Sequence, residues 1–476
     1  MTFEHTNDFY IDGRWRACTT SARTPVVNPA SEQLIGEIAA GSRDDVDMAV
    51  AAARRAFLNF SQTPVEVRLA LLGRILELIR ARAELFVTAL VTEMGAAISF
   101  ARASQVPFAA EHVRVSIDVL RRYQFLTLNG TTATAREAIG VCALITPWNW
   151  PLYQITAKVA PAIAAGCTVV LKPSELSPYS ALLFAQVMHD AGVPAGVFNL
   201  VNGTGEGVGA ALAAHSDVDM ISITGSTRAG VLVAQAAAPT VKRVVQELGG
   251  KSPNVFLDDA DFTQGVAKGV LAGFRNVGQS CSAPTRMLVP AARLAEVEAL
   301  AAEAAAGIRV GDPQLEETTL GPIANAAQFH RVQSMIDTGI DEGAKLVCGG
   351  PGRPKNLDRG YFVRPTIFSE VVPGMRIARE EIFGPVLSII PYRDEEEAVA
   401  IANDTIYGLG SHLQSRDRER ARRFAARIRA GQVHINYPAW DAQAPFGGYK
   451  RSGNGRDYGV FGFEEYLETN AIGGYL

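Results

Sequence analysis

One cysteine and one glutamate stand in glycine-containing runs that suit covalent catalysis. Cys281 ends the run 274–281 (FRNVGQSC), and Glu247 opens the run 247–253 (ELGGKSP), 34 residues upstream of the cysteine. A thiolate attacks a carbonyl carbon well, and a carboxylate in a partly desolvated turn takes a proton from a thiol or from water. The two runs therefore predict a nucleophile, Cys281, and a general base, Glu247.

A third run, 147–151 (PWNWP), contains Asn149. Its amide can donate a hydrogen bond to the oxygen of a tetrahedral adduct, and the backbone N–H of Cys281 can supply a second donor. Such an oxyanion hole is worth about 3 kcal/mol per donor. The other cysteines (Cys18, Cys142, Cys167 and Cys348) have no comparable surroundings, and we interpret them as structural. No C-x-x-C pair is present, so we expect neither a disulfide framework nor a metal site.

Together these three runs resemble the signature motifs of the aldehyde dehydrogenase superfamily, and the resemblance extends from about Tyr10 to Ile472. It implies an NAD(P)-dependent, hydrolytic, non-acylating enzyme that oxidises an aldehyde to a carboxylic acid. Cys281 would form a thiohemiacetal, hydride would pass to the cofactor, and water activated by Glu247 would hydrolyse the thioester. Lys158 matches a family lysine proposed to relay protons to an acidic residue near the C-terminus, which here is Asp457.

The resemblance also implies a set of cofactor residues. Lys172, Ser174 and Glu175 would bind the adenosine ribose, and Glu175 would repel a 2′-phosphate, which favours NAD although NADP stays open. Thr224, Gly225 and Ser226, at the start of a helix, would hold the pyrophosphate. Glu381 and Phe383 would hold the nicotinamide ribose and ring. The remaining residues implied at the cofactor are Thr146, Pro147, Trp148, Gly205, Leu248 and Gly249, of which Gly205 lies in a weak G-x-G pattern.

The substrate positions implied by the resemblance are mostly aromatic: Trp150, Tyr153, Trp440 and Phe446, with Ser280 and Ser282 beside the nucleophile. Ala157 stands where many relatives carry an aromatic residue. We therefore expect a roomy, mostly apolar pocket for a medium- or long-chain or cyclic aldehyde. No arginine is evident in these loops to meet a substrate carboxylate, so a semialdehyde acid is disfavoured.

Two other functions stay open. A cysteine hydrolase or acyltransferase would need a histidine base, and none of the seven histidines lies in a motif that pairs it with Cys281. A binding protein built on an inactive scaffold is disfavoured, because Cys281, Glu247, Asn149 and Lys172 are present together.

The elements that must position these residues follow from the hydrophobic pattern. Residues 44–60, 65–92 and 295–306 have the spacing or composition of helices. From about residue 139, short apolar runs alternate with helical segments, which predicts parallel βαβ units. With this pattern, the resemblance implies an α/β fold with a Rossmann-like NAD-binding domain (1–120 and 138–249), an α/β catalytic domain (250–450) and a small β oligomerisation segment (121–137 and 460–476).

Composition limits the partners and the location. The chain has 476 residues, a net charge of -4 and a pI near 6.1, which gives no electrostatic reason to bind nucleic acid or an anionic membrane. The longest apolar run, 159–171, is too short to span a bilayer, and residues 1–10 lack the features of a secretory signal. We expect a cytoplasmic enzyme whose partners are a small-molecule aldehyde and further copies of itself, as a homodimer or homotetramer.

Overall fold

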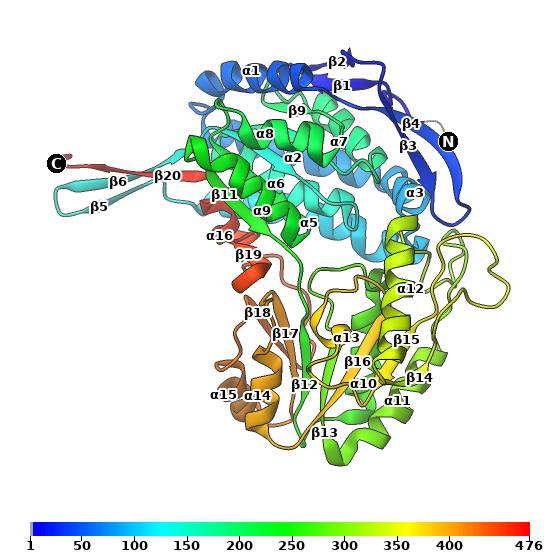
Figure 1. The fold of residues 1–476 in the computed structure, drawn as a ribbon. Helices are drawn as coiled ribbons and strands as arrows, with labels where there is room; N and C mark the ends of the chain where they lie inside the picture. Colours follow the sequence, from blue (N-terminus) through cyan, green and yellow to red (C-terminus); the bar gives the residue numbers. More distant parts are fainter. Residues whose placement is uncertain (1–2) are drawn as a thin grey trace.

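The computed structural model describes residues 3–476, and two large sheets with helices packed on them make up most of it (Figure 1). The first sheet has eight strands in the order β19-β11-β10-β7-β8-β9-β1-β2. Their bounds are Gly453–Asn454, Arg243–Glu247, Met220–Thr224, Val141–Ile145, Thr168–Lys172, Phe198–Leu200, Asp8–Ile11 and Arg14–Ala17. The five strands from β11 to β9 pair in parallel, as the βαβ pattern predicted.

Helices cover both faces of this sheet. They are α1 (Arg43–Phe60), α2 (Val65–Ala81), α3 (Ala83–Met94), α5 (Val106–Arg122), α6 (Pro151–Ala165), α7 (Tyr179–Asp190), α8 (Ala210–Ala214) and α9 (Thr227–Ala237). The stretch 65–92 was predicted as one helix but forms α2 and α3, because Arg82 departs from helical geometry at φ −106° and ψ 18°. A short helix, α4 (Ile98–Phe100), and a π-helical turn, η1 (Ala101–Gln105), lead into α5.

The second sheet has seven strands in the order β14-β15-β16-β13-β12-β17-β18. Their bounds are Lys345–Cys348, Thr366–Ser369, Val386–Tyr392, Arg286–Pro290, Pro253–Phe256, Gly410–Gln414 and Gln432–Ile435. The helices that surround it are α10 (Phe262–Phe274), α11 (Leu294–Ala306), α12 (Ala326–Asp341), α13 (Arg376–Arg379), α14 (Glu395–Asn403) and α15 (Arg418–Ala425). Each sheet has its own apolar core, so the α/β class with two layered units is confirmed.

A third, three-stranded antiparallel sheet projects from the body of the molecule (Figure 1). It consists of β5 (Leu126–Asn129), β6 (Thr132–Ala138) and β20 (Leu467–Ile472), and a short helix, α16 (Gly459–Glu464), precedes β20. Two further strands, β3 (Arg23–Asn28) and β4 (Gln33–Ala39), form a separate hairpin. Within residues 3–476, no helix combines the length and the apolar character that crossing a membrane requires.

Candidate active site

The segment before Cys281 is held in an unusual backbone conformation. After α10 the chain enters the turn η4 (Arg275–Gly278), in which Asn276, Val277 and Gly278 have φ of 55°, 60° and 71°. A Cβ on Gly278 would lie 2.2 Å from the carbonyl oxygen of Gly384, so only glycine fits this approach. The turn therefore presents Cys281, which is partly exposed, at the junction between the two sheets.

The loop after Glu247 packs directly on the loop that carries Cys281. Glu247 ends β11, and a Cβ added to Gly250 would lie 2.5 Å from the carbonyl oxygen of Cys281. The side chain of Glu247 is buried and its two oxygens have no hydrogen-bond partner in the described part of the chain. Gly447 lies against this side chain, since a Cβ added to Gly447 would lie 2.5 Å from Oε1 of Glu247. The structure thus brings the two predicted runs together.

Burial controls the protonation of both groups. It raises the pKa of Glu247 well above the ordinary value, and the negative charge of Asp457 raises it further while Lys158 lowers it. The pKa of the Cys281 thiol is also raised, first by burial and then by the charges of Glu247 and Glu381. Burial therefore favours the protonated form of both groups, and the Cys281 thiol must lose its proton before the sulfur can attack a carbonyl carbon.

Asn149 is tied to the loop of the cysteine by hydrogen bonds. Its side-chain nitrogen donates to the carbonyl oxygen of Gln279 at 2.9 Å, and the side chain of Asn276 donates to the backbone carbonyl of Asn149 at 2.8 Å. The second N–H of the Asn149 amide has no protein acceptor among the hydrogen bonds of residues 3–476. It can donate to an oxygen bound near Cys281.

Lys158 lies on α6 and is fully buried. Its Nζ donates to Asp457 Oδ2 at 2.8 Å and to Ser222 Oγ at 2.9 Å. The Asp457 side chain therefore reaches the lysine directly. Because both charges also act on Glu247, the pair belongs to the electrostatic environment of the predicted base.

Most of the predicted cofactor residues lie where strands of the first sheet end. The chain order of the strands reverses between β7 and β10, and in open α/β sheets ligands bind at such a switch point. Thr146 and Pro147 follow β7, Lys172 ends β8, Thr224 ends β10, and Leu248 and Gly249 follow β11. Ser226 caps α9 by accepting the N–H of Ala229 at 3.2 Å.

The ribose residues predicted after β8 also lie together. Lys172 Nζ donates to Glu175 Oε2 at 3.0 Å, and Ser174 Oγ accepts the N–H of Leu176 at 3.2 Å. The weaker candidate, Gly205, begins a second π-helical turn, η2 (Gly205–Gly209), which Thr204 caps.

Glu381 and Phe383 reach these residues from the half of the molecule built on the second sheet. Glu381 Oε1 accepts the N–H of Gly250 at 3.1 Å, and a Cβ on Gly249 would lie 2.1 Å from its other oxygen. Phe383 meets the ring of Trp148 edge-on at 5.4 Å. Burial raises the pKa of Glu381 to about 7.

The predicted aromatic residues form one connected group. Tyr153 lies 5.3 Å from Trp150 and 6.1 Å from Trp440, measured between ring centroids. Trp150 Nε1 donates to Ser280 Oγ at 2.9 Å, which joins the group to the nucleophile loop. Phe446 joins through Tyr458, a residue that the sequence analysis did not assign to the site. Ser282, on the other side of Cys281, lies against Gly410.

Sequence reasoning missed several members of this group: Phe100, Phe108, His112, Arg275 and Tyr458. Phe108 stacks on Trp440 at 4.2 Å, and the Arg275 guanidinium lies 5.8 Å from the centre of the Trp150 ring. Arg275 is thus a neighbour of the predicted aromatic residues that the sequence analysis did not identify. Apolar spacing predicts that residues such as Phe108 face inward on a helix, but no motif indicates which loop they meet.

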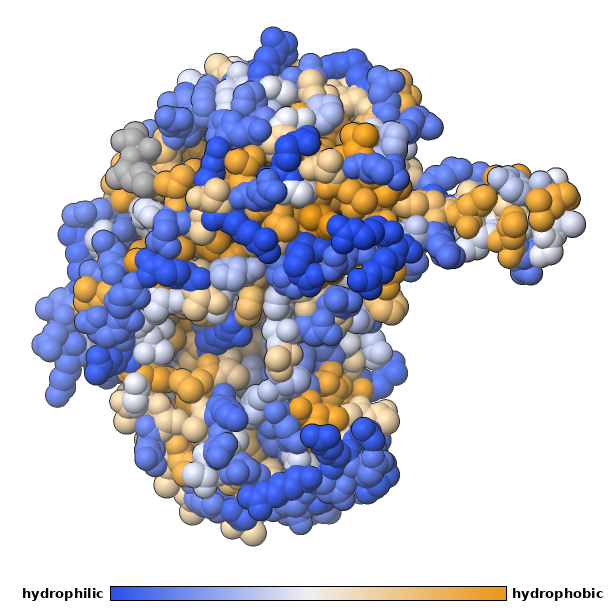
Figure 2. Space-filling view, turned by 180° about the vertical axis from the view of Figure 1, so that it is seen from behind, coloured by the Kyte–Doolittle hydropathy of each residue, from blue (hydrophilic) through white to orange (hydrophobic). Residues whose placement is uncertain are grey.

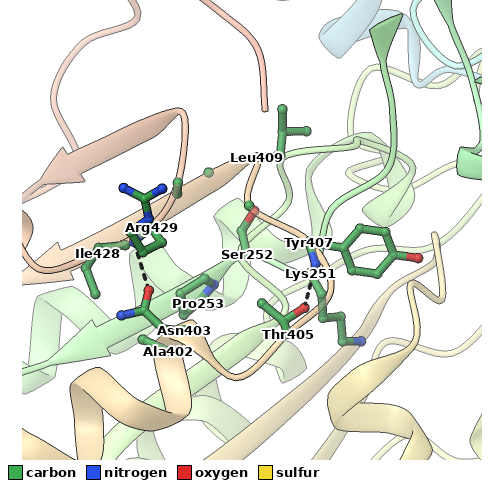
Figure 3. A pocket seen from close by; sticks show the side chains of 13 residues that line it. Lys251, Ser252, Pro253, Ala402, Asn403, Thr405, Tyr407, Leu409, Ile428 and Arg429 are labelled. Carbon is green, nitrogen blue, oxygen red and sulfur yellow. Dashed lines mark hydrogen bonds between the residues drawn. The ribbon is translucent and has the colours of Figure 1, made fainter. Parts of the chain in front are cut away.

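A small pocket elsewhere contains none of the predicted site residues. It is lined by Lys251, Asn403, Thr405, Tyr407 and Arg429 among others, and Figure 3 shows that several of its polar groups bond to one another. In the described chain, 3–476, no three His, Cys, Asp or Glu side chains gather closely enough to hold a metal ion.

Comparisons with known proteins agree with this geometry. The model of the aldehyde dehydrogenase family matches residues 15–472. A 3-succinoylsemialdehyde-pyridine dehydrogenase from a Pseudomonas species is 54% identical over 469 residues, which cover 98% of both chains. Among solved structures, a mutant of aldehyde dehydrogenase C from Pseudomonas syringae, in complex with NAD+ and octanal, is 69% identical with a TM-score of 0.99. That match covers 100% of this chain and 98% of the other.

A betaine aldehyde dehydrogenase from Staphylococcus aureus, solved with NAD+, is 33% identical with a TM-score of 0.95 and covers 99% of this chain and 95% of that one. The resemblance read from three short runs of sequence is confirmed along nearly the whole chain. The protein belongs to the aldehyde dehydrogenase family.

Proposed function

We propose that this enzyme oxidises an aldehyde to a carboxylic acid with NAD and that Cys281 is the nucleophile. One observation carries the proposal: the cysteine loop contacts both of its predicted partners. Asn149 donates to the carbonyl two residues before Cys281, and Gly250 of the glutamate loop packs on the carbonyl of Cys281 itself.

The reaction begins when the Cys281 thiol loses its proton and the sulfur attacks the aldehyde carbon. The adduct oxygen accepts hydrogen bonds from the free N–H of Asn149 and from the backbone N–H of Cys281. Loss of hydride from the adduct, for which bound NAD would be the acceptor, leaves a thioester on Cys281. Water then hydrolyses this thioester, and the Glu247 carboxylate takes a proton from that water. The missing hydrogen-bond partners of Glu247 support this role, because its oxygens are free to bind the water.

The chain fits a dinucleotide at the switch point of the first sheet. The hydroxyl of Thr146 is buried without a hydrogen-bond partner among residues 3–476, and Gly249 allows the Glu381 carboxylate to approach the backbone, since a Cβ there would lie 2.1 Å from it. Lys172 and Glu175 would hold the adenosine ribose, and the carboxylate would disfavour a 2′-phosphate, so we propose NAD as the preferred cofactor. Bound NAD supplies the hydride acceptor, while the protein orients the aldehyde and stabilises charge.

For the substrate we propose an apolar aldehyde of medium or long chain, or one with a ring. The connected rings of Trp150, Tyr153, Trp440 and Phe108 support this class. So do two relatives, one solved with octanal and one named for a pyridine-containing semialdehyde. Arg275 adds a cation at the edge of the rings, so a polar group at the far end of the aldehyde would also find a partner.

We further propose that copies of the chain assemble through the projecting sheet. All of β5 is exposed, including Leu126 and Leu128, and Figure 2 shows apolar residues gathered along this arm. An exposed edge of this kind is normally covered by another chain.

The cytoplasm, where thiols stay reduced, suits an enzyme that depends on a free cysteine, and we propose that location.

The test is NADH formation by the wild type and by Cys281→Ala with octanal, benzaldehyde and succinate semialdehyde, using NAD and NADP in parallel. We expect turnover with NAD and the apolar aldehydes, and loss of turnover in the variant. Equal activity of the variant would remove Cys281 from the mechanism, and best efficiency on succinate semialdehyde would overturn the substrate class.

A further inference from the structure

Asn276 is the centre of a buried hydrogen-bond network in front of the cysteine. Its side-chain nitrogen donates to the carbonyl oxygens of Asn149, at 2.8 Å, and of Gln279, at 3.2 Å. The same Gln279 carbonyl accepts the side-chain amide of Asn149. Asn276 therefore sets the position of both the predicted oxyanion donor and the backbone that leads to Cys281.

The orientation of Asn276 is set in turn from outside the cysteine loop. Its Oδ1 accepts the side-chain N–H of Gln105 at 3.2 Å, and Gln105 is the last residue of the π-helical turn η1. The residue before it, Ser104, accepts a hydrogen bond from Arg275 at 3.0 Å. Two adjacent residues of one π-helical turn thus bind two adjacent residues of the cysteine loop, and π-helical turns frequently occur at functional sites.

The surroundings of Gln105 indicate that its bond to Asn276 is the reason for an amide at this position. Gln105 is 1% exposed and its Oε1 has no partner within the described chain. A buried carbonyl without a hydrogen bond costs about 1–3 kcal/mol, so an apolar residue would be the more stable choice here. Asn276 has a φ of 55°, in the left-handed region that asparagine tolerates better than most other residues, so this turn suits an asparagine.

We propose that Gln105 is a positioning residue for the reaction: through Asn276 it holds the Asn149 amide and the Cys281 backbone where the adduct oxygen will form. Gln105 itself touches neither substrate nor nucleophile. Without its N–H, the Asn276 carboxamide is free to rotate, and the two carbonyls that it binds lose a fixed donor. This inference rests on the proposed function and adds a residue to it that lies 176 positions before the cysteine.

The experiment replaces Gln105 with methionine, which has a similar shape but no donor. We expect kcat to fall by about tenfold or more, because small displacements of catalytic groups are costly, while the KM for NAD stays within about twofold. Arg102→Met is the matched control. Arg102 lies in the same turn, and within residues 3–476 it forms ion pairs with Glu84 and Glu316 at the surface. The Arg102→Met variant therefore tests whether any substitution that destabilises η1 lowers kcat.

A second comparison separates positioning from a structural role. In the Asn149→Ala background one of the two groups that Gln105 helps to position is absent, so Gln105→Met should lower the residual kcat by a clearly smaller factor than it lowers that of the wild type. An equal loss of kcat in both backgrounds, or a single variant within about threefold of wild type, would overturn the inference.

Should the methionine variant fail to fold, Gln105→Leu takes its place in both comparisons. Leucine has no hydrogen-bond donor and leaves no buried polar group without a partner. Turnover by the wild type in the same assay tests the proposed function separately. No turnover by the wild type would overturn the proposed function, whereas normal turnover by both the wild type and the Gln105 variant would overturn only the role of Gln105.

Discussion

Lys158 and Asp457 form an ion pair of 2.8 Å whose side chains are 0% and 4% exposed. One residue comes from α6 and the other from the segment just before α16. A charge buried this deeply needs a partner, because the interior solvates it poorly. The pair thus joins the C-terminal segment to the first sheet and places two opposite charges near Glu247.

Removing one partner of this pair should be strongly destabilising. We expect Lys158→Met to lower the free energy of unfolding by about 3–5 kcal/mol, because the Asp457 carboxylate is left buried and unpaired. Replacing both residues, as Lys158→Met with Asp457→Leu, should restore much of the loss. Denaturant unfolding of the two variants and the wild type checks this.

The control for that experiment is Lys345→Met. Lys345 binds Glu298 at 2.7 Å, but its side chain is 49% exposed, and an exposed pair contributes about 0–1 kcal/mol. If Lys158→Met and Lys345→Met lowered the free energy of unfolding by similar amounts, burial of the Lys158–Asp457 pair would have no energetic consequence.

Glu247→Gln should separate the two halves of the reaction. Without the carboxylate, hydrolysis slows while attack by Cys281 still proceeds, so acyl enzyme accumulates. We expect a burst of NADH followed by a steady rate about a hundredfold or more below wild type, as is typical when a general base is lost. Mass spectrometry of the quenched variant should find the acyl group on the protein; rapid hydrolysis with no burst would remove Glu247 from this step.

The same residue should determine how turnover depends on pH. Because the pKa of Glu247 is raised by burial, its carboxylate form is scarce at acidic pH and grows as the pH rises toward that raised pKa. The rate of hydrolysis by the wild type should therefore rise with pH. The rate of hydrolysis by Glu247→Gln should not show this rise. Parallel pH profiles of kcat for the two proteins would contradict the assignment.

Glu175 should decide between the two cofactors. Its carboxylate binds Lys172 at 3.0 Å and disfavours a 2′-phosphate at the adenosine ribose. Glu175→Gln removes that charge, so kcat/KM with NADP should rise by about tenfold, roughly the effect of 1.4 kcal/mol, while NAD is used less well. Glu66→Gln, on the exposed surface of α2, is the control and should leave the ratio of the two cofactors unchanged.

His112 should make the enzyme sensitive to acid. Burial lowers its pKa to about 3 in the folded state, from an ordinary 6.5. As the pH falls below 6.5, the unfolded chain takes up this proton and the folded chain does not, so the free energy of unfolding falls. By pH 5 the loss from this one group is about 2 kcal/mol.

His112→Leu should remove that part of the acid sensitivity. We would compare the thermal midpoints of wild type and variant at pH 8 and at pH 5. An equal drop in both proteins would mean that His112 does not stay neutral in the folded state.

Local sequence was sufficient to find the chemistry of this protein. A nucleophile and a base could be predicted from short runs because a reactive thiol and a carboxylate that act on one substrate need particular neighbours, chiefly glycines that allow close backbone approach. Gly250, against the Cys281 carbonyl, is such a case. The parallel strands were also predictable, since a strand buried on both faces is apolar along its whole length.

Other features depend on contacts between distant segments, and local sequence does not specify them. Arg275 was overlooked because only packing brings it against Phe100, Phe108 and Trp150. The predicted single helix 65–92 divides at Arg82, although apolar spacing continues across the break.

The sequence by itself determined the family and the alternation of strands and helices, and it predicted the reactive residues, because each depends on neighbours within a few positions. Only the tertiary structure decided that Asp457 reaches Lys158 and that Gln105 binds Asn276. Such pairs form when separate elements are packed to within hydrogen-bond distance, and that distance is a property of the whole fold.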